Sequence, residues 1–263
     1  MKKNDEFYIG YVDEVGTETK TTLKRFVLYS LITLVVVGFL FSFFQETAVN
    51  SSFDFNEPTK VSGIYHETPY PMLRVQLADD IYKDILLLGF GKFGPNQYLN
   101  AIKSENGSLV NKALTIEGQL IYYNGQTLLE IDDSQKITLS GSVNRNEIKK
   151  PSSIGQIELE GEIVDPKCYF GVMKPGFGKI HRSCAALCIS GGIPPVLVAT
   201  NEQETDDYFL LTNLKGEPIH QDILPFIGQP AKLLGELSEL GDWKVLKIDV
   251  DRIEKLGKAS SIY

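Results

Sequence analysis

Two stretches that align without a gap decide the fold of this chain: residues 113–132, ALTIEGQLIYYNGQTLLEID, and residues 230–249, PAKLLGELSELGDWKVLKID. Each has a glycine within an apolar run, Gly118 or Gly235, followed by a turn and an alternating segment that ends in Ile-Asp. Alternating apolar and polar residues are typical of a half-buried strand, so each stretch is predicted to form a β-hairpin with Trp243 in the core. A glycine inside a strand indicates a bulge or sharp bend, as small barrels require.

A second pair of matching stretches lies upstream of the hairpins: residues 61–70, VSGIYHETPY, and residues 159–168, LEGEIVDPKC. In both, a strand with a glycine leads into a proline turn. The chain is therefore predicted to be mainly β, with two tandem OB-like small β-barrels at residues 61–142 and 156–255. The upstream and hairpin glycines are 55 residues apart in the first copy and 74 in the second, which is longer by 19 residues. This surplus falls in the interval that holds a cysteine-rich loop at residues 165–195, where we expect a helical insertion.

An apolar segment precedes the β region: residues 26–44 read FVLYSLITLVVVGFLFSFF, without a charged residue. About 20 apolar residues cross the hydrocarbon core of a bilayer, so a transmembrane helix is predicted at residues 26–45. A cleaved signal peptide is the alternative interpretation, but its apolar core is usually shorter. Residues 1–25 are expected to form a cytoplasmic tail and residues 46–60 a linker.

Cations border the apolar segment on its N-terminal side, at Lys20, Lys24 and Arg25. The positive-inside rule then leaves the N-terminal tail in the cytoplasm and the barrels outside. We expect a single-pass protein of the cytoplasmic (inner) membrane whose C-terminal domains are periplasmic or exterior. That compartment is oxidising in bacteria.

The composition argues against nucleic-acid binding and against a scaffold held by disulfides. The 263 residues carry a formal net charge of −8, which argues against a general nucleic-acid binder. Three cysteines are too few for a disulfide scaffold, and their grouping within 21 residues indicates a site.

The cysteine-rich loop combines the residue types of a soft metal site. Residues 180–190 are predicted to form a short helix, because glycines and prolines flank them on both sides. His181, Cys184 and Cys188 would share one face of that helix, while Cys168 lies at the end of the preceding strand. The pattern C-x12-H-x2-C-x3-C offers three thiolates and one imidazole, a complete set for zinc or copper, and Met173 is an additional soft ligand for Cu(I).

Two other interpretations of the cysteines stay open. One is a disulfide, most easily between Cys168 and Cys184 or Cys188, that leaves one cysteine free. The other is a reactive thiol whose pKa is lowered by neighbouring cations. The cations of the loop are also candidates for binding an anionic ligand or cofactor, or an acidic partner: Lys167, Lys174, Lys179 and Arg182. No catalytic residue is predicted, because the chain shows no Ser/His/Asp motif.

The run DPKCYFGVMKPGFGKIHRSCAALCISGGIPP at residues 165–195 resembles the signature of an uncharacterised family of bacterial membrane-anchored proteins. The EFYIGY tail at residues 6–11 resembles that group too. The resemblance supports a site in the loop but implies no activity. In layout the chain is also similar to the haem chaperone of cytochrome c maturation, with a short tail, one anchor and an external OB barrel. The haem-binding histidine motif of that family is absent, so haem delivery is not expected.

These features lead to one main hypothesis and two alternatives. The main hypothesis is a membrane-anchored extracytoplasmic protein, a non-catalytic or accessory subunit, that carries a Cys/His metal or redox site and acts with a membrane redox complex. The first alternative is a structural or interaction module with a disulfide-locked docking loop. The second is a thiol oxidoreductase.

Overall fold

The computed structural model describes residues 16–44, 50–55, 57–140, 151–200 and 206–257. The chain divides into two compact units, Met1–Ala48 and Val49–Tyr263.

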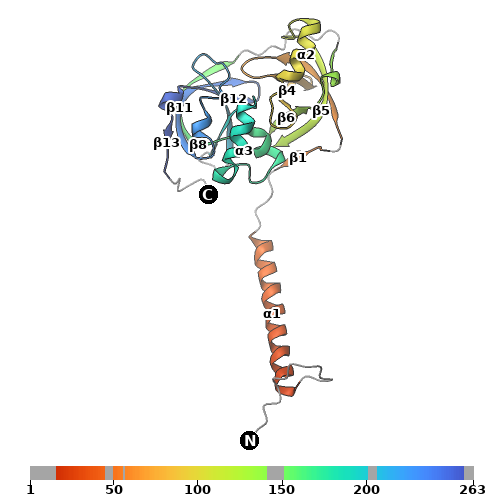
Figure 1. Ribbon diagram of the computed structural model, residues 1–263, viewed down its shortest axis with the longest axis vertical. Coiled ribbons are helices and arrows are strands. Elements are labelled where there is room, and N and C mark those ends of the chain that lie inside the picture. The colour runs from red at the N-terminus through yellow and green to blue at the C-terminus, as the bar shows by residue number, and fades with distance from the viewer. Residues whose placement is uncertain (1–15, 45–49, 56, 141–150, 201–205, 258–263) are drawn as a thin grey trace. The chain divides into compact units, whose positions relative to one another are not determined.

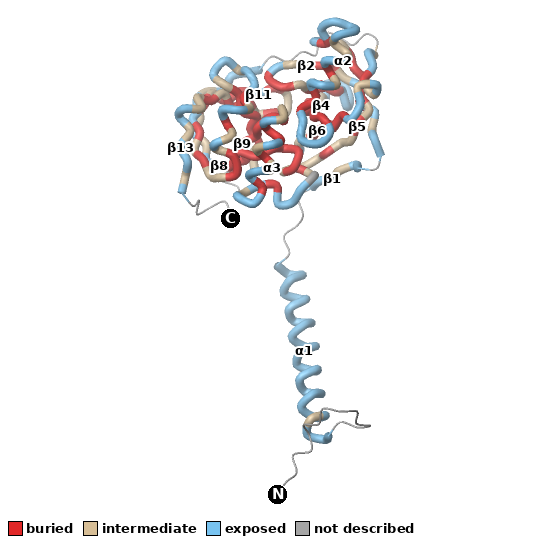
Figure 2. The backbone as a smooth tube through the Cα atoms, in the orientation of Figure 1, coloured by how far each residue is buried: buried red, intermediate tan, exposed pale blue. Residues whose placement is uncertain are grey.

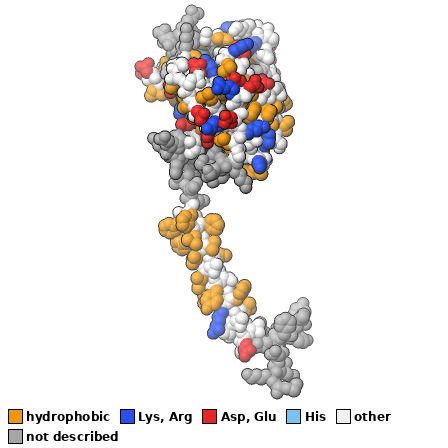
Figure 3. Space-filling view, turned by 90° about the vertical axis from the view of Figure 1, so that its left-hand side faces the viewer, with side chains coloured by type: hydrophobic (Ala, Val, Ile, Leu, Met, Phe, Trp, Pro, Cys, Tyr) orange, Lys and Arg blue, Asp and Glu red, His pale blue; other side chains and the backbone are white. Residues whose placement is uncertain are grey.

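The described part of the first unit is helix α1 (Thr17–Phe43) with its flanking residues, and no side chain of this helix is buried. Its most apolar 18-residue window has a mean hydropathy of 2.4, so the helix is long and apolar enough to cross a membrane. Hydrophobic side chains follow it along most of its length (Figure 3). The helix begins nine residues before the predicted span, so residues 17–25 of the predicted tail are helical. Residues 1–15 of that tail lie outside the described residues.

The second unit begins with a five-stranded barrel (Figure 1). Its first three strands form an antiparallel meander. The third strand runs parallel to the fifth strand. The fourth strand pairs with both the fifth and the first strand and so closes the barrel. In this order the strands are β2 (Thr59–His66), β3 (Met72–Ala78), β4 (Ile81–Gly89), β5 (Ala113–Tyr123) and β6 (Gln126–Ile131). Helix α2 (Asn96–Asn106) lies between the third and fourth strands along the chain, and the short strands β1 (Ser51–Phe53) and β7 (Ile137–Leu139) pair with β5.

The second barrel repeats this connectivity, including the parallel pair and the closing hairpin. Its strands are β8 (Ser152–Val164), β9 (Val196–Thr200), β10 (Asp206–Thr212), β11 (Pro230–Leu240) and β12 (Trp243–Ile248), and β13 (Glu254–Lys255) pairs with β11. The predicted fold class, two tandem OB-like barrels with a helical insertion in the second, is confirmed. The predicted linker at residues 46–60 is partly wrong, since it includes β1 and the start of β2.

The glycines that revealed the repeat occupy equivalent places in the two barrels. Gly63 pairs with Leu114 and Gly161 with Ala231, the same correspondence that aligns the two hairpins. A Cβ atom at Gly63 would lie 2.4 Å from a carbonyl oxygen of the neighbouring strand, and one at Gly161 would lie 2.2 Å away. Both barrels therefore need a residue without a side chain where the sheet bends most closely on itself.

Three hydrophobic clusters fill the double barrel. Figure 2 marks the buried stretches of the backbone in red. One belongs to the first barrel, one to the second, and the third is built from both. Trp243 is fully buried in the shared cluster, as predicted, and its Nε1 donates a hydrogen bond to the carbonyl oxygen of Asp84 in the first barrel at 2.8 Å. The two barrels thus pack through apolar faces, and the shared cluster also contains Cys168 and Cys188.

The extra length of the second barrel lies in one connection. The first two strands are joined by residues 67–71 in the first barrel and by residues 165–195 in the second. The longer connection forms a π-helical turn, η3 (Cys168–Val172), and helix α3 (Gly178–Ser190). In Figure 1, α3 lies between the two barrels. The predicted helix is confirmed and begins two residues early, whereas Cys168 lies in the turn and not at the strand end.

Candidate functional site

Asp165 organises the start of the insertion. It follows β8 directly, and its Oδ1 accepts a hydrogen bond from the backbone N–H of Cys168 at 2.8 Å. Its own carbonyl oxygen accepts one from the N–H of Tyr169. A carboxylate in this position satisfies the free N–H groups of a helical turn, so the chain leaves the strand and turns at once.

The three cysteines converge on one point. The sulfurs of Cys168, Cys184 and Cys188 all lie within 4.8 Å of one another, although they come from two different elements. All three are free thiols. Cys168 and Cys188 are buried, with 5% and 2% of their surface exposed, while Cys184 is partly exposed. Cys184 is therefore the member of the cluster that solvent reaches most readily.

The two buried thiols have opposite tendencies to ionise. The hydrogen bond between them, reinforced by burial, raises the pKa of Cys168. The same hydrogen bond lowers the pKa of Cys188, against the effect of burial and with help from the charge of Lys92. Cys188 is the better thiolate of the pair, and Cys168 is the donor that stabilises it.

Lys92 reaches the cluster from the first barrel. Its ammonium group donates a hydrogen bond to the sulfur of Cys184 at 2.7 Å, and this contact raises the pKa of Lys92. Its loop is held in place because the N–H of Gly94 donates to the carbonyl oxygen of Gly191 at 2.9 Å. The close approach needs glycine on both sides, since a Cβ at Gly94 would lie 2.4 Å from the carbonyl oxygen of Gly192 and one at Gly191 would lie 2.0 Å from the carbonyl oxygen of Lys92.

His181 pairs with Asp165. Its Nε2 lies 3.2 Å from Oδ2 of Asp165, and both side chains are buried. Asp165, His181 and Cys168 form a second group whose ligand atoms are within 4.8 Å of one another. The two groups share Cys168, so the site comprises a thiol cluster and an adjoining carboxylate–imidazole pair.

The three predicted cysteine ligands thus come together, while the predicted histidine ligand has a different neighbour from the one expected. Cys168, Cys184 and Cys188 cluster as expected, but the partner grouped with His181 and Cys168 is Asp165. Met173 is 46% exposed, whereas the thiols nearby are mostly buried, and its role as a ligand stays a prediction.

The cations predicted to bind an anionic cofactor have separate contacts. Lys174 lies over the ring of Tyr123, at 4.5 Å from the centroid, and burial lowers its pKa. Exposed Lys179 lines a different hollow beside Pro230, and the guanidinium of Arg182 donates to the carbonyl oxygen of Pro225 at 3.3 Å. Lys167 is buried and paired with a carboxylate. The insertion therefore presents these cations to different neighbours.

Asp165 and Lys92 contribute to the site but are not among the site residues predicted from the sequence. Asp165 opens the quoted stretch and precedes a proline, a common start for a capped turn, so its capping role had a local signal. Lys92 lies in the run GFGKFGP at residues 89–95, whose glycines indicate a close backbone approach. Nothing in that run says which surface it approaches.

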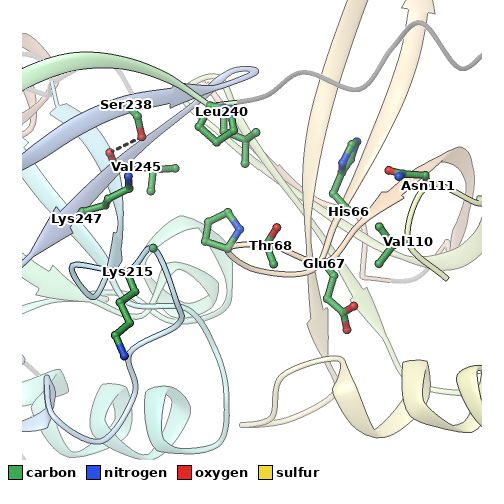
Figure 4. Close-up of a pocket in the computed structure, with 13 residues that line it drawn as sticks. His66, Glu67, Thr68, Val110, Asn111, Lys215, Ser238, Leu240, Val245 and Lys247 are labelled. Carbon is green, nitrogen blue, oxygen red and sulfur yellow. Dashed lines mark hydrogen bonds between the residues drawn. The ribbon is translucent and has the colours of Figure 1, made fainter. Parts of the chain in front are cut away.

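A separate cleft lies between the barrels, with a volume of about 490 Å³. Figure 4 shows Ser238, Leu240 and Val245 on one side and His66, Val110 and Asn111 on the other. Two of its polar side chains have partners, since Ser238 donates to the carbonyl oxygen of Val245 and Lys247 is 3.7 Å from a carboxylate oxygen of Glu236, whereas the buried Nε2 of His66 has none among the described residues. The cysteine cluster, with its convergent ligand atoms, is the stronger candidate site.

No protein-family model and no curated protein matches this chain.

Proposed function

We propose that the protein is a membrane-anchored accessory protein whose extracytoplasmic double barrel binds a soft metal ion at Cys168, Cys184 and Cys188. It would act beside a membrane redox complex, without a catalytic role of its own. The convergence of three sulfurs from two elements within 4.8 Å carries this proposal. Supporting it, the cluster lies on the one insertion that distinguishes the second barrel from the first.

The ligand chemistry suits copper or zinc. A metal bound by thiolates at about 2.3 Å in a tetrahedral site holds its sulfurs about 3.8 Å apart, so a small contraction of this cluster suffices. Three thiolates favour Cu(I), a soft ion. Addition of His181 would complete a Cys3His set for Zn²⁺. In that case Asp165 supports the imidazole, as carboxylates commonly do for ligating histidines.

The position in the cell rests on α1 and its flanking charges. Lys20, Lys24 and Arg25 lie in the N-terminal part of the apolar helix, which favours a cytoplasmic N-terminus. The double barrel would then lie outside the cytoplasmic membrane, in the periplasm of a bacterium. A membrane redox complex is the expected partner, because an anchored soft-metal site in an oxidising compartment suits the handling of copper or electrons.

Metal analysis of the full chain in detergent tests the proposal. The reduced protein is loaded with Cu(I) or Zn²⁺, passed over a chelating resin and analysed for bound metal. We expect about one equivalent per chain in the wild type and in Ser183→Ala, and loss of the metal in Cys184→Ser and Cys188→Ser. A wild-type chain that retains neither metal would overturn the proposal.

A second candidate function is thiol oxidoreduction. The hydrogen-bonded pair of Cys168 and Cys188 and the ammonium group beside Cys184 favour it. Equilibration with glutathione redox buffers would test it, since a redox pair converts to a disulfide over a narrow range of potential. If none of the three thiols forms a disulfide in any buffer, thiol oxidoreduction is ruled out. The disulfide-locked docking loop lacks such support, because the three cysteines are free.

A further inference from the structure

The outer face of α3 carries apolar side chains that no core covers. Ile180 is 78% exposed and Leu187 is 58% exposed, and a spacing of seven residues places them on the same side of the helix. The opposite side is buried through His181, Ala185 and Cys188. An exposed helix face is normally polar, so a pair of exposed large apolar residues on it marks a surface for contact.

Phe93 extends this apolar surface from the first barrel. It is 56% exposed and lies in the loop whose Gly94 is hydrogen-bonded to Gly191, at the C-terminal end of α3. The loop is further fixed by the bond from Lys92 to Cys184. The surface is thus formed by two segments that are held together, and its position does not depend on a mobile side chain.

The charges around this surface are positive. No aspartate or glutamate occurs from residue 166 to residue 201, although the chain as a whole carries a net charge of −8. Lys179 is exposed on α3, and exposed Lys92 borders the helix through its contact with Cys184. A surface with apolar side chains and a basic rim is complementary to an anionic layer that offers both headgroups and hydrocarbon.

The chain also enters the double barrel beside the insertion. Strand β1, which follows α1 along the sequence, lies against η3, and a Cβ at Gly171 would be 3.7 Å from the Cβ of Phe53. Among anionic partners, a phospholipid surface is the one that the predicted anchor would keep close to this part of the chain.

We propose that the outer face of α3, together with Phe93, is a docking surface for anionic phospholipid. Ile180, Leu187 and Phe93 enter the interface between headgroups and acyl chains, while Lys179 contacts the phosphates. None of the apolar side chains in this surface is a proposed metal ligand, and the backbone bond from Gly94 to Gly191 holds the loop without a metal, so the docking proposal would persist if the metal proposal failed.

Quenching by brominated lipid tests this docking in the full chain. Leu187→Trp is reconstituted into vesicles of phosphatidylcholine, alone or mixed with phosphatidylglycerol, that contain acyl-brominated lipid. The native Trp243 is fully buried and provides a constant background. The matched control is Leu214→Trp, at a position 66% exposed between β10 and β11. We expect strong quenching at position 187 in the anionic vesicles, weaker quenching in phosphatidylcholine and none at position 214.

Variants that lack one of the cations measure how much the basic rim contributes to docking, apart from the apolar side chains. Lys179→Gln in the Leu187→Trp background should weaken docking about fivefold, the equivalent of about 1 kcal/mol per cation near an anionic surface. Arg182→Gln is the matched control, because Arg182 donates to the carbonyl oxygen of Pro225 on another side of α3, and it should change docking less. Ile180→Trp is a second reporter if Leu187→Trp does not fold. Unquenched emission from both reporters in anionic vesicles would overturn the proposal. A concentration-dependent blue shift in detergent without vesicles would also overturn it, because it would assign the surface to a second copy of the chain.

Discussion

At the scale of single residues, the three cysteines differ because their surroundings differ. Cys168 and Cys188 share a hydrogen bond inside the core that joins the barrels, whereas Cys184 lies at its edge beside Lys92. Their spacing along the chain predicts that they meet on or near one helix face. It does not predict which of them solvent reaches, since that depends on what packs over the helix.

Alkylation of the native protein should therefore follow exposure. We expect iodoacetamide to modify Cys184 first, and Cys168 and Cys188 only as the protein opens, because the reagent needs access to the thiolate. Mass mapping over time measures the order. In Cys184→Ser the native protein should show almost no early labelling. Equal labelling rates for the three wild-type thiols would contradict the arrangement described above.

Asp165 should contribute more to stability than an ordinary cap. Its buried carboxylate accepts a hydrogen bond from the N–H of Cys168 and pairs with His181. Asp165→Ala removes both interactions, so it should lower the free energy of unfolding by about 2–4 kcal/mol. Asp165→Asn keeps an oxygen for the N–H and should cost less. Urea denaturation measures both.

Asp133→Ala is the matched control, because Asp133 is exposed and caps a 3-10 turn by accepting from the N–H of Gln135. Its removal should cost about 1 kcal/mol. Equal losses for Asp165→Ala and Asp133→Ala would mean that the contact with His181 adds nothing to stability.

At the scale of elements, the glycines that marked the repeat have a steric role. A Cβ at Gly161 would lie 2.2 Å from the carbonyl oxygen of Val198, on a neighbouring strand that cannot withdraw easily. Gly161→Ala should therefore destabilise the protein by about 2 kcal/mol or more, measured by thermal or urea unfolding. In Gly257→Ala the added atom meets nothing within 4 Å, so stability should change little. Comparable stability of the two variants would refute the close approach.

At the scale of the whole double barrel, the ion pair of Lys167 and Glu130 is the more deeply buried of the two that join the halves within the described residues, the other being Lys83 with Asp242. Lys167 of the second barrel lies 2.7 Å from a carboxylate oxygen of Glu130 in the first, and its ammonium also donates to the carbonyl oxygens of Gly89 and Gly91. Lys167→Met should cost about 3–5 kcal/mol, because it leaves the carboxylate buried without a partner. The double variant Lys167→Met with Glu130→Leu should recover much of this loss.

The exposed ion pair of Lys60 and Glu117 is the control for the buried ion pair of Lys167 and Glu130. Lys60 is 74% exposed and 3.5 Å from the carboxylate, so Lys60→Met should change stability by about 1 kcal/mol or less. Urea unfolding followed by Trp243 fluorescence reports on the contact between the barrels in every variant. A small effect of Lys167→Met would show that the ion pair does not hold the barrels together.

The repeat could be predicted from the sequence alone because strands, turns and in-strand glycines leave local signals. The alternation in the two hairpins and the matching positions of Gly63 and Gly161 were enough to predict two OB-like barrels, and the surplus length located the insertion. The boundaries were less accurate: the apolar helix begins at Thr17, and β1 lies within the predicted linker. Both differences lie in short segments. The structure of such a segment depends on pairing with another strand or on extension of the neighbouring helix, and not on the local pattern of residues.

By itself the sequence determined the types of element, the duplicated barrel, the apolar helix and the kinds of ligand in the loop. All of these depend on residues close together in the chain or on a repeated pattern. Only the tertiary structure decided that Lys92 reaches Cys184, that Asp165 turns back to His181, and that the thiols lie in a core shared by both barrels. The physical reason is that these contacts depend on how one barrel packs on the other. That packing is set by the summed burial of apolar faces, which no single stretch of sequence encodes.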